Sequence, residues 1–330
     1  MQRDLEHVVE VVGAGDPGLR SLVLTGAFAR GEGAILDGRP QNDYDLVALR
    51  GLRNSRIPYD QMRRSLERDL GLHVDLAPVG AWRLPFLSRS IFWYETALKG
   101  QVLWGEELLH RIPVRSPTTI GRSEGLRLLV NRAAGLLLAT GMKDHHAVRI
   151  QASKALLAAL DAQLLAAGIF PPSHGERWQA LLRLREDGLA KGPLAGDVSW
   201  FEWAYHYKVD PARSEERSTD MAWRAARRAV LDAVPTALHH AGLKSLDDYA
   251  HRDGLVDHLI YHQRSARLPG AKRWAMNPTG RVRLATLRLL EATPDGEVNL
   301  HAARRALRGL VACQDAPLET LEAVRGATLQ

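Results

Sequence analysis

The hydrophobic positions of the first third of the chain change repeatedly between helical and strand-like spacing. Apolar residues three or four apart favour amphipathic helices, and short apolar runs bounded by polar or glycine-rich turns favour buried strands. The pattern predicts helices over 4–12, 59–70 and 91–99, and strands around 22–24, 43–49, 72–79 and 100–105. Short strands and helices in this alternation are typical of a layer of helices packed on a sheet.

From residue 123 onward the pattern is helical almost throughout. Leu126, Leu129, Val130, Ala133 and Leu137 form one apolar stripe at helical spacing. Further helices are predicted at 150–167, 178–185, 221–234, 255–267, 282–290 and 300–313. Prolines and polar residues cluster at 113–119, which marks a boundary. We therefore predict an α+β protein with a mixed-sheet domain over 1–115 and a helical domain over 116–330, with a further break near 235–250.

One stretch of the first region carries most of the candidate chemistry. A glycine turn at Gly26 follows the first strand, and a polar loop leads to a second strand that bears Asp43 and Asp45. Side chains two apart on a strand project from the same face, so these two carboxylates lie side by side. Adjacent carboxylates repel unless a cation lies between them, and Mg²⁺ prefers such oxygen ligands. Asp75 lies between apolar neighbours on a later strand, where an isolated acid is costly to bury.

These residues resemble a known motif. The elements of the motif are Gly26-Ala27, Arg30-Gly31-Glu32, Asp43-x-Asp45 and a third acid, Asp75. The pattern resembles the DNA polymerase β-like nucleotidyltransferase superfamily, in particular its minimal and aminoglycoside-type members. Ala27 stands where a serine is usual in that family, which removes a hydroxyl expected to contact a phosphate. The apolar runs at 131–139 and 154–168 also resemble the helical region of the aminoglycoside-type enzymes.

The resemblance implies roles for seven residues and a reaction. The implied catalytic and metal-binding residues are Asp43, Asp45 and Asp75, and the implied nucleotide-binding residues are Gly26, Ala27, Arg30 and Glu32. Two metal ions ~3.5–4 Å apart, Mg²⁺ or Mn²⁺, would offset the charge at the α-phosphate. The implied enzyme moves a nucleoside monophosphate, expected to be AMP, from a triphosphate, expected to be ATP, to a hydroxyl of a small molecule.

Two other functions stay open at this point. The first is modification of a protein or RNA end by an antitoxin-like nucleotidyltransferase, although the long helical region argues against the minimal form. The second is a catalytically silent regulator that binds nucleotide or nucleic acid. Ala27 supports the regulator, and so does a set of arginines for which a solvated face is the simpler explanation: Arg281, Arg283, Arg288, Arg304, Arg305 and Arg308.

Further candidate residues have competing interpretations. Arg30 is expected to pair with a phosphate or with Glu32. Glu95 suits a cationic acceptor, but an exposed helix acid is the simpler interpretation. Lys154 could reach a phosphate, but we favour a side chain that extends to solvent. The aromatic run at 200–207 could stack a base, but we favour a core patch.

Composition adds little to this picture. The net charge of +6 is a mild indication of polyanionic partners, and nucleotide alone accounts for it, so we do not favour nucleic acid. No apolar run approaches the ~18 residues of a membrane helix, so we expect no membrane and a cytoplasmic protein. The single cysteine, Cys313, excludes an internal disulfide. The acceptor and the oligomeric state stay open.

Overall fold

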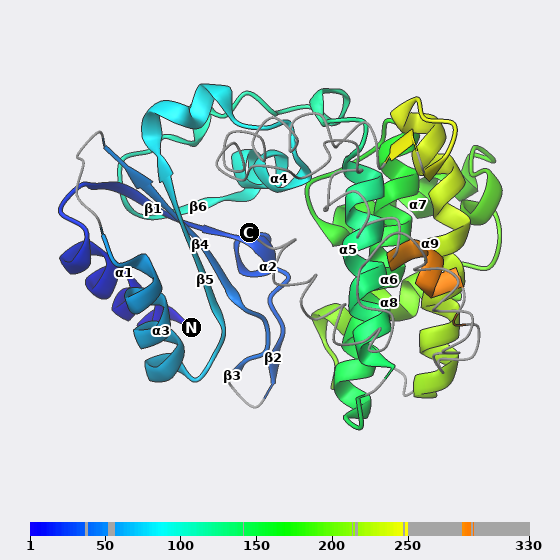
Figure 1. Ribbon diagram of the computed structural model, residues 1–330, viewed down its shortest axis with the longest axis horizontal. Coiled ribbons are helices and arrows are strands. Elements are labelled where there is room, and N and C mark those ends of the chain that lie inside the picture. The colour runs from blue at the N-terminus through cyan, green and yellow to red at the C-terminus, as the bar shows by residue number, and fades with distance from the viewer. Residues whose placement is uncertain are drawn as a thin grey trace, which may run out of the picture. The chain divides into compact units, whose positions relative to one another are not determined.

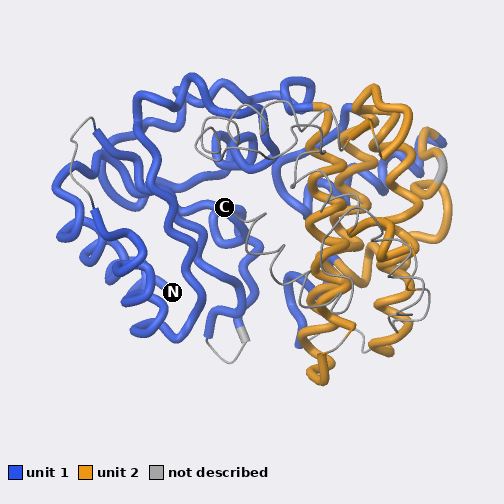
Figure 2. Tube along the Cα trace, viewed as in Figure 1, with its two compact units in different colours: residues 1–121, 168–188, 205–214 blue, residues 122–167, 189–204, 215–330 orange. Residues whose placement is uncertain are grey.

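The computed structural model describes two compact units (Figures 1 and 2). Unit 1 comprises residues 1–121, 168–188 and 205–214, and unit 2 comprises 122–167, 189–204 and 215–330. The described residues are all except 37–38, 52–56, 141, 213, 215–216, 247, 250–285, 292 and 294–330. The chain first leaves unit 1 at Gly121, and two later segments return to it. The division into domains 1–115 and 116–330 stays a prediction.

Unit 1 is built on a mixed four-stranded sheet in the order β5-β4-β1-β6. The strands are β1 (Leu19–Thr25), β4 (Tyr44–Arg50), β5 (Val74–Gly80) and β6 (Gln101–Gly105). Strand β1 is antiparallel to both β4 and β6, and β4 is parallel to β5. The expected α+β class, a small mixed sheet followed by a mainly helical region, is confirmed.

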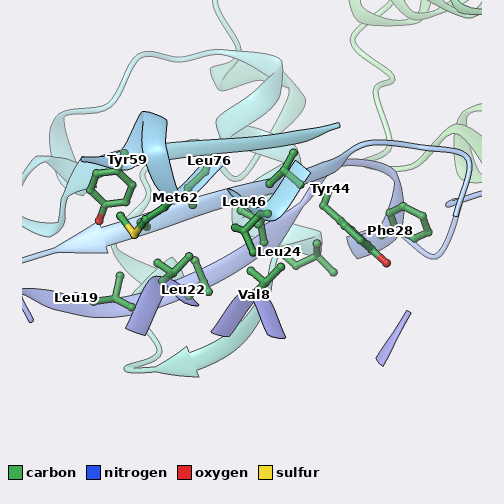
Figure 3. Close-up of a cluster of buried hydrophobic side chains, with 14 of the residues drawn as sticks. Val8, Leu19, Leu22, Leu24, Phe28, Tyr44, Leu46, Tyr59, Met62 and Leu76 are labelled. Atoms are coloured by element: carbon green, nitrogen blue, oxygen red, sulfur yellow. The ribbon is translucent and has the colours of Figure 1, made fainter. Parts of the chain in front are cut away.

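Two helices cover one face of this sheet. They are α1 (Gln2–Gly15) and α3 (Tyr59–Leu70), which contact one another beside the sheet in Figure 1. The even-numbered residues of the central strands point towards them, and Leu22, Leu24 and Leu46 are fully or almost fully buried there (Figure 3). Helix α3 ends at a left-handed Gly71, which is the usual way to end a helix.

The odd-numbered residues of the same strands point to the opposite face. Val23, Val47 and Leu49 form a second core there. The covering elements are the 3₁₀ helices η1 (Ala81–Phe86) and η2 (Leu109–Arg111) and the helix α4 (Ile91–Lys99). Because side chains alternate along a strand, Asp45 belongs to this second face together with Val47.

The segments of unit 1 that come late in the sequence are mainly helical. Helix α7 (His174–Glu186) begins at Ser173, whose hydroxyl accepts a hydrogen bond from the Glu176 amide while the Glu176 carboxylate accepts one from the Ser173 amide. Helix α8 (Ser199–Val209) passes from unit 2 into unit 1 at residue 205.

Unit 2 is a helical assembly in which α5 (Glu124–Ala139), α6 (His145–Ala166) and α9 (Thr219–Ala241) contact one another. The predicted apolar stripe on α5 is buried, which confirms it. Trp223 of α9 donates its indole N–H to the Leu136 carbonyl at 2.9 Å. The short 3₁₀ helix η4 (Gly192–Leu194) also belongs to this unit.

Several predicted elements differ from the structure. Helix α9 runs through Pro235 to Ala241, beyond the expected end at 234, and the apolar pattern does not predict α8. The expected loop at 82–86 is 3₁₀-helical, and the polar loop after Gly31 contains two short paired strands, β2 (Ile35–Leu36) and β3 (Arg39–Pro40). Residues 286–290 are helical, as expected for the described part of 282–290, and residue 291 is helical as well.

The predicted helices 255–267 and 300–313, Cys313 and five of the six arginines (all but Arg288) lie outside the described residues. Among the residues that are described, no helix combines the length and the apolarity needed to cross a bilayer.

Candidate functional site

Three aspartates meet at one end of the sheet. Strand β4 begins at Tyr44, so Asp43 directly precedes the strand and Asp45 is its second residue. In the parallel register of β4 and β5, Asp45 pairs with Asp75. Paired residues on neighbouring strands share a face. Asp43 is close enough for its charge to act on Asp45, and continuing the alternation of the strand by one residue puts it on the same side. The three carboxylates therefore lie on the α4 face of the sheet.

The electrostatics of Asp45 reflect this convergence. Burial is the largest cause that raises the pKa of the Asp45 carboxyl to about 6, and the negative charges of Asp75 and Asp43 act in the same direction. Two cations lower the pKa, namely Arg30 and Lys208. The three acids thus form a centre of negative charge that nearby positive groups offset in part.

Asp75 is exposed and has a histidine as its neighbour. Its Oδ1 lies 3.4 Å from Nε2 of His73, and Nδ1 of His73 lies 2.6 Å from Oε1 of Glu67. Within the described part of the chain, no three histidine, cysteine, aspartate or glutamate side chains are already grouped as a metal site. The donor set nevertheless fits a hard divalent cation, because it consists of carboxylate oxygens on one face.

The glycine turn lies directly against Asp45. Gly26 has a φ of +67°, a conformation that residues with a side chain rarely adopt. A Cβ at this position would lie 1.8 Å from Oδ2 of Asp45. The sequence pattern assigns this glycine to nucleotide approach, and the structure adds that the carboxylate occupies the space of the missing side chain. Ala27 follows in the short helix α2 (Gly26–Ala29) and is buried.

Arg30 and Glu32 belong to a buried ion-pair network. Arg30 donates from Nε to Glu32 at 3.0 Å and from Nη1 to Glu95 at 2.7 Å. Glu95 is held from its other oxygen by Nη2 of Arg177, so the interpretation of Glu95 as an exposed helix acid is wrong. Of the two partners expected for Arg30, the structure shows Glu32. Glu32 also accepts a hydrogen bond from the Gly175 amide at 2.8 Å.

The late segments contribute residues that the sequence pattern does not single out. Arg177 and Gly175 lie on α7, and Lys208 lies on α8, far after the aspartates in the chain. Tyr205 of α8 belongs to the same surroundings: burial, and after it the charge of Glu32, raises the pKa of its hydroxyl. The aromatic residues at 203 and 207 are buried, in agreement with the core patch favoured for the run 200–207. No local sequence signal distinguishes Lys208, which follows them. Lys154, the lysine considered from the sequence, lies in unit 2.

Comparisons with known proteins add little to this description. No protein-family model matches the sequence, and no curated protein is similar to it. One solved structure, described as "Crystal structure of the toxin-antitoxin with AMP-PNP", aligns with 31% of this chain and 74% of its own at 19% identity and a TM-score of 0.25. A TM-score this low supports no inference about fold or function.

Proposed function

We propose that this protein is a metal-dependent nucleotidyltransferase that moves a nucleoside monophosphate, AMP in the first instance, from a triphosphate to a hydroxyl of a small molecule. The observation that carries this proposal is the convergence of Asp43, Asp45 and Asp75 on one face, with Asp45 packed against a left-handed glycine turn. Two further acids beside the half-buried Asp45 carboxylate are costly without a cation, and that cost favours a site that binds one.

Each residue has a role in the proposed reaction. Asp43 and Asp45 would hold divalent cations, with Asp75 completing the set, and the cations would supply charge neutralisation at the α-phosphate. The turn at Gly26 lets backbone amides approach the triphosphate. Lys208 adds positive charge beside Asp45, which suits phosphate oxygens.

The proposed transfer forms one bond to phosphorus and breaks another. The acceptor oxygen forms a bond to the α-phosphorus, and the bond to the bridging oxygen breaks, so pyrophosphate leaves with the electron pair. The proton of the acceptor hydroxyl passes to Asp75, the candidate general base, which is exposed and can reach an acceptor. Glu95 is not offered to a cationic acceptor, because Arg30 and Arg177 engage both of its oxygens.

The test is transfer of label from α-³²P-labelled triphosphates with Mg²⁺ or Mn²⁺, screened against small-molecule, protein and RNA acceptors. Asp45→Asn and Asp43→Asn are each expected to lower turnover at least about 10³-fold, since each removes a ligand of the cation on which the chemistry depends. Asp60→Asn, an exposed acid on α3, is the matched control and should keep wild-type turnover.

A second measurement separates catalysis from binding. Mn²⁺-dependent binding of a non-hydrolysable triphosphate should weaken in Asp45→Asn and persist in Asp60→Asn. Wild-type protein that neither binds triphosphate with metal nor releases pyrophosphate across the acceptor set would refute the proposed function.

A further inference from the structure

Four charged side chains, two of them from the turn at 26–32, contact one another in unit 1. Arg30 contacts Glu32 and Glu95, and Arg177 contacts Glu95 from the other side. The side chains of Arg30, Glu32 and Arg177 are 8%, 7% and 1% exposed, and that of Glu95 is 15% exposed. Two positive and two negative charges make the group neutral. A buried group of this kind is stable while its charges are paired, and removing one charge leaves another uncompensated.

Arg177 is held at every part of its guanidinium. Its Nε donates to the Pro171 carbonyl at 2.8 Å, and Nη1 lies 3.4 Å from Nδ1 of His174. The guanidinium carbon lies 3.9 Å from the centroid of the Phe170 ring. These contacts come from its own segment, 168–188, whereas Nη2 reaches out to Glu95 on α4. Arg177 therefore joins the late segment 168–188 to helix α4 of the early sequence.

Two connections run from this segment to the turn. One passes from Arg177 through Glu95 to Arg30, and the other runs from the Gly175 amide to Glu32. Arg30 and Glu32 are the last residues of the turn that begins at Gly26 and contacts Asp45. The backbone of the turn is closed by the Gly31 amide on the Phe28 carbonyl at 3.1 Å and the Glu32 amide on the Ala27 carbonyl at 2.9 Å.

We propose that Arg177 is a positioning residue that fixes the turn at 26–32 through Glu95 and Arg30. The assignment of this turn to nucleotide binding rests on the proposed function, whereas the positioning itself does not. In this arrangement Arg177 holds Glu95, and Glu95 holds Arg30, which belongs to the turn. The proposed catalytic unit therefore includes residues 168–188. A protein cut after residue 115 would lack this support.

The charges allow a sharp set of variants. Arg177→Gln leaves the group with one excess negative charge, and Glu95→Gln leaves it with one excess positive charge. The paired variant carries both substitutions and keeps the neutral Arg30–Glu32 pair. If uncompensated charge loosens the turn, each single variant is affected and the paired variant recovers.

Hydrogen exchange in the full-length protein measures the turn without reference to activity. The Gly31 and Glu32 amides should exchange about tenfold faster in each single variant, because exchange reports the free energy of local opening, and within about threefold of wild type in the paired variant. The control is Arg20→Gln, which breaks an exposed arginine–glutamate pair with Glu106 in the same unit and should leave both amides unchanged. A second control, Lys99→Gln, breaks the exposed ion pair between Lys99 of α4 and Glu176 of α7 and should change the exchange of these two amides little.

Kinetics give the second readout once transfer is established. Arg177→Gln should raise the KM for triphosphate about tenfold and leave the KM for the acceptor unchanged, because the turn is assigned to the nucleotide and loss of positioning weakens its binding. A general loss of folded protein would instead lower the rate measured with either substrate varied, and it would lower the melting temperature as well. If wild type shows no transfer, the proposed function fails, and the exchange experiment still decides the positioning role.

Several outcomes would overturn the proposal. One is that the Gly31 and Glu32 amides exchange at the same rate in Arg177→Gln and in wild type. Another is that these amides exchange faster in the paired variant than in either single variant. If Arg177→Gln does not fold, the comparison is between Glu95→Gln and the paired variant, and the proposal requires slower exchange in the latter.

Discussion

The contact between Gly26 and Asp45 gives a sharp prediction for the substitution Gly26→Ala. The added Cβ would lie 1.8 Å from Oδ2 and 2.7 Å from Cγ of Asp45, so the carboxylate has to move. Gly31 provides a matched control in the same turn. Its φ is +74°, against +67° for Gly26, but a Cβ there would meet nothing within 4 Å. Comparing the two alanine variants therefore separates the clash from the backbone strain.

The two substitutions share one energetic cost and differ in a second. Placing alanine in the left-handed region costs roughly 1–2 kcal/mol, and both variants incur it. In Gly26→Ala the carboxylate must also retreat by roughly 1.5 Å to reach ordinary van der Waals separation, and a 1 Å displacement of a catalytic group can lower the rate about 10²-fold. We expect kcat/KM for the triphosphate to fall about 10²-fold further in Gly26→Ala than in Gly31→Ala.

The assay is pyrophosphate release with Mg²⁺ under conditions in which both variants are folded, as checked by thermal melting. Both melting temperatures should fall by a similar few degrees, at about 2–4 °C per kcal/mol for a unit of this size. Mn²⁺-dependent nucleotide binding should weaken in Gly26→Ala alone. Equal activity in the two variants would refute the inference that Gly26 is required to leave room for Asp45.

Two further substitutions test other parts of unit 1. Asp16→Asn should lower the free energy of unfolding by about 3 kcal/mol, because the Asp16 carboxylate is fully buried and accepts hydrogen bonds from Arg50, Tyr59 and the Gly18 amide. Burial opposes the charged form of Asp16, but these hydrogen bonds outweigh burial and lower the pKa of the carboxyl. The contribution of Asp16 to the free energy of unfolding is therefore complete above about pH 4 and is lost as the pH falls through the lowered pKa. Urea unfolding from pH 7 to pH 3 should show the difference between variant and wild type shrinking below about pH 4, and a difference that stays constant would contradict this explanation. Ala27→Ser should tighten triphosphate binding or raise turnover about tenfold, since a hydrogen bond to a charged group is worth roughly 1.5–3 kcal/mol, and titration with a non-hydrolysable triphosphate measures the binding. If the wild-type protein is active and Ala27→Ser changes neither triphosphate binding nor turnover, backbone amides suffice at this position.

Local sequence patterns specify the elements of the sheet layer. Strand alternation and helical spacing are properties of neighbouring residues, so the pattern predicts the helices at 59–70 and 91–99 with the bounds that they have in the fold. The same reasoning places Asp43 and Asp45 on one face, because the two-residue period of a strand needs no information from the rest of the chain. Local patterns also identify the glycine turn, since positive φ is a property of single residues.

Long-range contacts determine how these elements meet. The pairing of Asp45 with Asp75 depends on the register of two parallel strands, which the sequence of neither strand specifies. The space at Gly26 is occupied by a side chain from another strand, so the reason for that glycine is a contact between distant parts of the sequence.

The late segments of unit 1 show most clearly the difference between what local sequence specifies and what long-range contacts determine. Arg177 lies on a short helix whose pattern resembles any other amphipathic helix, and only folding brings it to Glu95, 82 residues earlier. Burial then turns an ordinary arginine and an ordinary glutamate into a neutral group from which water is largely excluded. The sequence thus specifies which side chains can carry charge, and the tertiary structure selects which charges are buried together, because Coulomb energies depend on distance and on exposure to solvent.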